Sequence, residues 1–201
     1  MITAPRRFGK TTNLDMLLSF FSGLMDNEIF MKLKIGESTS MKWWGKFNVV
    51  YVTFGHFAGD ICSKEDCVKA CQSILHAAFQ HFDYIESALP ESDVTAFNEW
   101  LDEKLYLKKT DTEVGNGLRF SVDCVAKYDS NKHVLLLVDK FDRICSSAFW
   151  KMDENTLDVV MKFYCDMVGN AVKHEPKCVA VLTGVTAVSY THLTLPTIYS
   201  V

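Results

Sequence analysis

The residues with the clearest chemical meaning form the run Ala4-Pro5-Arg6-Arg7-Phe8-Gly9-Lys10-Thr11-Thr12. A loop that holds nucleotide phosphates needs backbone N–H groups facing phosphate oxygens, a lysine, and a hydroxyl group for Mg²⁺. Gly9 allows the backbone to approach closely, Lys10 supplies the cation and Thr11 the hydroxyl, although Ala4 replaces the first glycine of the pattern. We therefore predict a Walker A phosphate-binding loop, whose binding residues are Arg7, Phe8, Gly9, Lys10, Thr11 and Thr12.

A second motif supplies the carboxylate that such a site needs. The apolar run 134–138 ends in Asp139, as expected for a buried strand whose last residue helps to hold Mg²⁺ (Walker B). Buried strands also end in Asp at ordinary turns, so this prediction depends on both motifs together. The pair predicts Thr11 and Asp139 as the metal-side residues. Thr183, at the end of a later strand, is a candidate sensor of the terminal phosphate or else a turn residue beside Gly184.

The elements that position these residues alternate along the chain. Continuous apolar runs of β-rich composition predict strands, and apolar residues at helical spacing predict helices. Strands that alternate with helices imply a parallel sheet with helices on both faces. We expect a loop at 111–117, strands at 1–3, 47–54, 133–138 and 178–182, and helices at 11–24, 64–84, 94–106, 118–127 and 157–172.

The motifs resemble those of the AAA-ATPase-like domain family. The string Arg6-Arg7-Phe8-Gly9-Lys10-Thr11 is the most specific part, followed by a leucine-rich stretch that ends in Phe20-Phe21. The runs 137–142 and 181–185 resemble the family's acidic motif and its later Leu-Thr-Gly strand. The resemblance covers about residues 1–187 and implies an α/β P-loop NTPase fold of the RecA/AAA type, truncated at both ends. It also implies ATP and Mg²⁺ as cofactors, and self-association or an attached nuclease or other effector domain as partners.

One position departs from the family pattern. The acid that normally activates the attacking water is replaced by Lys140. An ammonium group cannot accept a proton, and loss of a general base costs about 10²–10⁴-fold in rate. Lys10 and Asp139 remain as catalytic residues, and Asp142 is the candidate substitute base. Two functions stay open: a Mg²⁺-dependent ATPase, and a non-hydrolysing nucleotide-binding module that regulates an effector. A small-molecule kinase would need an acceptor site that the sequence does not reveal.

Composition limits the alternatives. The chain of 201 residues has a net charge of −4, which gives no sign of the basic surface typical of nucleic-acid binding. The start of the sequence does not resemble a signal peptide, and no apolar run is long enough to cross a bilayer. Cys62, Cys67 and Cys71 lack the close pairing of structural zinc ligands, so we interpret the helical thiols as core residues. These features predict a cytoplasmic protein.

The sequence changes character near its end. The run Val188-Ser189-Tyr190-Thr191-His192-Leu193-Thr194-Leu195-Pro196-Thr197 can be back-translated to the transposon-end adapter of sequencing libraries. We therefore interpret residues 188–201 as read-through of library DNA rather than as part of the domain at 1–187. The alternative is a natural polar tail. Read-through would account for the absence from this sequence of a following nuclease domain.

Overall fold

The computed structural model describes residues 1–185, and the interpretation of residues 188–201 lies outside them. Four strands alternate with helices along this part of the chain. The strands are β1 (Ile2–Thr3), β2 (Phe47–Thr53), β3 (His133–Asp139) and β4 (Cys178–Gly184). The helices are α1 (Lys10–Ser22), α2 (Asn27–Met31), α3 (Lys64–Gln80), α4 (Glu91–Leu101), α5 (Asp111–Tyr128), α6 (Arg143–Ala148) and α7 (Glu154–His174). Short 3₁₀ turns cover Lys34–Glu37, Thr39–Trp43, Asp83–Ala88 and Tyr106–Lys108.

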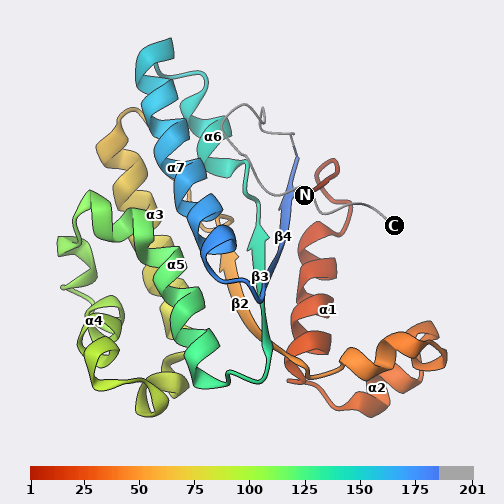
Figure 1. The fold of residues 1–201 in the computed structure, drawn as a ribbon. Helices are drawn as coiled ribbons and strands as arrows, with labels where there is room; N and C mark the ends of the chain where they lie inside the picture. The colour runs from red at the N-terminus through yellow and green to blue at the C-terminus, as the bar shows by residue number, and fades with distance from the viewer. Residues whose placement is uncertain (186–201) are drawn as a thin grey trace.

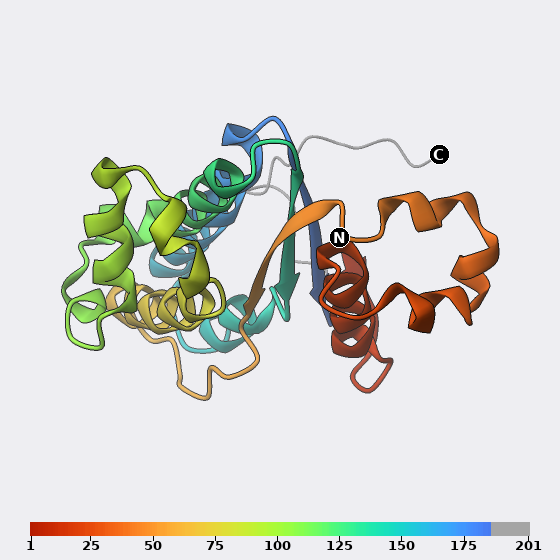
Figure 2. The same ribbon diagram turned by 90° about the horizontal axis from the view of Figure 1, so that it is seen from below.

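The four strands form one sheet in the order β1-β4-β3-β2, and all neighbouring strands are parallel. Helices α3, α5 and α7 cover one face, and α1 covers the other (Figures 1 and 2). Strand β3 lies inside the sheet, and all its residues after His133 are buried, which explains its continuous apolar sequence. This arrangement confirms the predicted α/β architecture with a parallel sheet and helices on both faces.

The prediction of a loop at residues 111–117 was wrong, because these residues form the first turns of α5. Thr110 and Glu113 make a capping box, in which each side chain bonds the backbone N–H of the other residue. Gly115 and Gly117 lie in this stretch, and glycine is a weak helix former. Gly117 is buried, and a Cβ atom there would lie 2.7 Å from Leu75 and 2.8 Å from Trp100. Close packing between helices therefore explains a glycine that the sequence pattern interprets as a break.

The main core lies between the sheet and helices α3, α5 and α7, and a smaller apolar cluster lies under α1. Cys67 and Cys71 are fully buried in the main core, as predicted for the helical thiols, whereas Cys62, which precedes α3, is exposed. No helix within residues 1–185 combines the length and apolar character needed to cross a membrane. Because all strands are parallel, their carboxyl ends meet at one edge, where parallel α/β sheets bind ligands.

Candidate functional site

The loop between β1 and α1 curves through two residues in the left-handed region. Arg7 has φ of 66° and Gly9 has φ of 72°. Gly9 is also the N-cap of α1, and its carbonyl accepts the N–H of Asn13 over 2.8 Å. No side chain caps this end, and the first turn contains no acidic residue. The first N–H groups of the helix, together with the positive end of its dipole, are thus suited to an anion.

The side chain of Lys10, the first residue of α1, reaches back into the curve of this loop. Its Nζ atom donates hydrogen bonds to the carbonyl oxygens of Ala4 and Pro5, the second over 2.7 Å. The ammonium group is therefore held inside the curve of the loop. This is the position from which a lysine reaches bound phosphate in a Walker A loop.

Asp139 connects the loop to the sheet. It is 1% exposed, and its carboxylate accepts hydrogen bonds from three threonine hydroxyl groups, two at strand ends and one at the start of α1. Thr11 Oγ1 donates to Oδ2 over 2.9 Å, and Thr183 Oγ1 donates to Oδ1 over 2.8 Å. Thr53 Oγ1 lies 3.4 Å from Oδ2 and also accepts the N–H of Gly55 over 3.0 Å. Thr11 and Asp139, 128 residues apart in sequence, are in direct contact.

Thr183 and Asp142, the two other candidate catalytic residues, each have a partner close by. Thr183 is 2% exposed, and its hydroxyl is directed at Asp139. Asp142 accepts the N–H of Val185 through Oδ2 over 3.0 Å, and its Oδ1 lies against Gly184. Asp142 also lines the cavity described next, so its role as a substitute base stays a prediction.

A cavity of about 690 Å³ opens beside the loop. Most of the predicted loop residues line it, whereas the side chain of Phe8 is 68% exposed and is not among the described lining residues. Five basic side chains line it, and the carboxylate of Asp142 is the one acidic group among the described lining residues. The basic side chains are those of Arg6, Arg7, Lys10, Lys140 and Arg143. A mildly acidic chain therefore contains a strongly basic cavity, as a polyphosphate requires.

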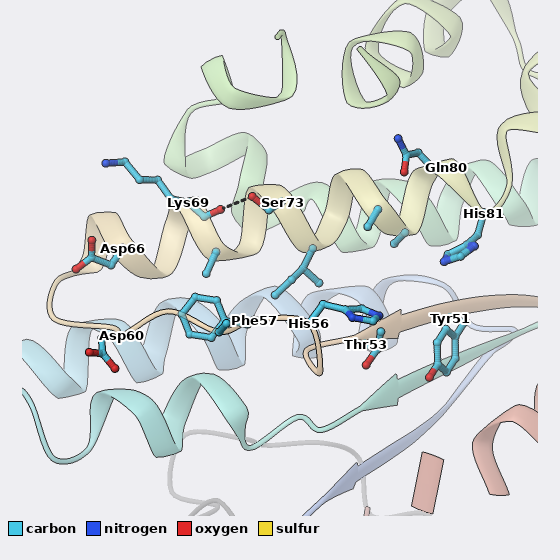
Figure 3. Close-up of a pocket in the computed structure, with 15 residues that line it drawn as sticks. Tyr51, Thr53, His56, Phe57, Asp60, Asp66, Lys69, Ser73, Gln80 and His81 are labelled. Carbon is cyan, nitrogen blue, oxygen red and sulfur yellow. Dashed lines mark hydrogen bonds between the residues drawn. The ribbon is translucent and has the colours of Figure 1, made fainter. Parts of the chain in front are cut away.

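A second cavity, of about 640 Å³, lies between α3 and the segment after β2 (Figure 3). Thr53 and His56 line it, whereas Gly55 between them lines the basic cavity. Burial, together with the negative charges of Asp139 and Asp15, raises the pKa of Tyr51 in its wall to about 12. The carboxylates of Asp60 and Asp66 line this cavity, so it lacks the cationic character of its neighbour.

Sequence reasoning missed Thr53, Arg143 and Ser146. Thr53 ends a predicted strand, so the rule that parallel strands end at one edge could have placed it there. Arg143 and Ser146 lie in α6, whose six residues are too few to show a helical period. Both residues line the cavity because the chain turns after β3, and no sequence pattern predicts the direction of that turn.

The oxygen atoms at this site fit a hard cation. Hydroxyl and carboxylate oxygens are the ligands that Mg²⁺ takes in phosphate sites, and Thr11 and Asp139 place both kinds side by side. The neighbouring lysine and helix N-terminus fit phosphate oxygens. The described groups together can bind an anionic phosphate chain and an accompanying cation.

Comparison with known proteins agrees with this geometry. A family model described as a predicted AAA-ATPase, of the AAA-ATPase-like family, matches residues 1–194. Neither a curated protein nor a solved structure matches the chain significantly. The family match therefore covers nearly the whole chain, including the loop, the buried aspartate and the cavity that they line. The chain belongs to the AAA-ATPase-like family of predicted AAA-ATPases.

Proposed function

We propose that this chain is a P-loop nucleotide-binding domain of the RecA/AAA type that binds ATP together with Mg²⁺. The observation that carries the proposal is the hydrogen bond between Thr11 and Asp139, because it joins the two motifs that Mg²⁺-nucleotide sites require. The basic cavity beside this pair supports the proposal. Lys10 and the first N–H groups of α1 bind the phosphates, and Thr11 and Asp139 hold the cation.

The proposed binding is tested by thermal unfolding with and without Mg²⁺-ATP. A ligand that binds only the folded state at 100 times its Kd stabilises it by about 2.7 kcal/mol. We expect this stabilisation in the wild type and a large loss of it in Lys10→Ala. Lys162→Ala is the matched control, because Lys162 lies on the exposed face of α7. The proposal is falsified if Mg²⁺-ATP stabilises Lys10→Ala and the wild type equally.

For catalysis, two functions remain in competition. A hydrolysing ATPase needs a group that takes the proton of the attacking water. Lys140 stands at the family's position for this group, and one oxygen of Asp142 accepts the Val185 N–H. These two observations favour the second function, a non-hydrolysing nucleotide-binding module that regulates an effector. Binding would then stabilise one arrangement of the loop and α6 without turnover.

Steady-state phosphate release separates the two functions. We expect slow release by the wild type and faster release by Lys140→Glu, because a carboxylate at this position can accept the proton. Asp142→Asn, measured in parallel, reports whether Asp142 substitutes for the missing base. Equal and substantial turnover by the wild type and Lys140→Glu would exclude the non-hydrolysing function.

A further inference from the structure

The backbone fixes the position of Lys140 at the end of β3. Its φ of 54° lies in the left-handed region, which is uncommon for a lysine. The residues on both sides are anchored, because the carbonyl of Asp139 accepts the N–H of Phe54 over 3.0 Å and the N–H of Phe141 bonds Thr183 over 2.8 Å. The hydroxyl of Tyr164 also bonds the carbonyl of Phe141. The direction in which the Lys140 side chain leaves the strand is therefore set by the fold.

Gly55 provides the space that this side chain occupies. A Cβ atom on Gly55 would lie 2.6 Å from Lys140 Nζ and 3.1 Å from its Cδ. Both residues line the basic cavity, so the exposed Lys140 side chain lies at the cavity wall. The long cationic side chain of Lys140 can take this position only because residue 55 has no side chain.

Arg143 adds a second cation from the same segment. It lies in the first turn of α6 and lines the cavity, and its Nε donates a hydrogen bond to the carbonyl of Phe57 over 3.2 Å. Lys10, in contrast, is the first residue of α1. Two segments that are distant in sequence therefore supply cations to one cavity, and one of them is the segment where the family has its acid.

We propose that Lys140 and Arg143 bind the terminal phosphate of a nucleoside triphosphate, and that they allow the nucleotide to bind without a divalent cation. This inference rests on the nucleotide binding proposed above. A metal ion normally offsets the charge of the phosphate chain, and here the ammonium and guanidinium groups offset part of it instead. A carboxylate at position 140 would repel the same phosphate. The site should therefore prefer triphosphate to diphosphate, and this preference should persist in EDTA.

Equilibrium titration of ATP and ADP, each in Mg²⁺ and in EDTA, tests this role. For the wild type we expect EDTA to weaken ATP binding by less than about tenfold, the effect of 1.4 kcal/mol. Lys140→Met keeps a long unbranched side chain but removes the charge. It should weaken metal-free ATP binding by at least roughly tenfold, the effect of losing one hydrogen bond to a charged group, and ADP binding by much less. The control Lys162→Met should change neither.

Gly55→Ala provides a second variant that leaves the charge in place. As a single substitution, its methyl group should displace the Lys140 ammonium and weaken metal-free ATP binding. Added to Lys140→Met, the same substitution should weaken metal-free ATP binding no further. The role is overturned if Lys140→Met binds metal-free ATP as the wild type does, or if it loses ATP and ADP equally. Failure of the underlying function would look different, since the wild type would then bind no Mg²⁺-ATP at all.

Discussion

Replacement of Thr183 by valine tests the hydroxyl network around the buried aspartate. Valine has nearly the same shape, so the change removes one hydroxyl and leaves the packing of β4 intact. Thr183 is 2% exposed and donates over 2.8 Å to a carboxylate that is itself 1% exposed, so water cannot easily replace it. A hydrogen bond to a charged group is worth about 1.5–3 kcal/mol. We expect the free energy of unfolding to fall by roughly this amount.

Urea denaturation measures this loss directly, and thermal unfolding gives a second reading. For a domain of this size, about 1 kcal/mol corresponds to roughly 2–4 °C in Tm. Thr53→Val is the matched control, because its hydroxyl lies 3.4 Å from the same carboxylate and is only half-buried. We expect a smaller loss, at most about 0.5–1.5 kcal/mol, because this change removes the long contact to Asp139 and the neutral bond that the hydroxyl accepts from the Gly55 N–H. Equal losses in the two variants would refute the argument that the short buried bond holds Asp139 in place.

Four further substitutions test other parts of the structure. In α5, Gly115→Ala should stabilise the protein by about 0.5–1 kcal/mol, whereas Gly117→Ala should destabilise it by about 1–3 kcal/mol because its methyl group would overlap the core; chemical denaturation measures both. The Thr110 backbone and side chain hold the pKa of Glu113 at about 2 in the folded state. The stability from this depressed pKa should thus be lost as pH falls from 4.5 towards 2 in the wild type, and be absent from Glu113→Gln. Phe8→Ser should leave nucleotide affinity unchanged in a binding titration, because the ring is exposed.

Local sequence patterns were sufficient for the main parts of the fold. The apolar run before Asp139 predicts β3, because a strand buried on both faces needs apolar residues at every position. The contact between Thr11 and Asp139 was also predictable in outline, since parallel strands present their carboxyl ends at one edge. The loop predicted at residues 111–117 failed for a local reason. The sequence signature of the Thr110–Glu113 capping box, which marks the start of a helix, was missed.

Other features could not be derived from local patterns. Helix α6 is too short to show a period, so Arg143 could not be assigned to the cavity wall. Gly117 could not be recognised as a packing glycine, because the side chains that exclude a methyl group there come from α3 and α4. In both cases the deciding contacts join residues that are far apart in sequence.

The sequence by itself determined which chemical groups this protein can use: the lysine and hydroxyl of the predicted Walker A motif, the carboxylate of Asp139, and the ammonium group of Lys140 directly after it. Only the tertiary structure decided where these groups point. Thr183 faces Asp139, and Lys140 lies beside Gly55 at the cavity wall. The physical reason is that side-chain direction at a strand end depends on backbone dihedrals and on neighbours from other strands. On either side of Lys140, whose φ is 54°, the backbone is hydrogen-bonded to Phe54, just after β2, and to Thr183 in β4, and both partners are far away in sequence.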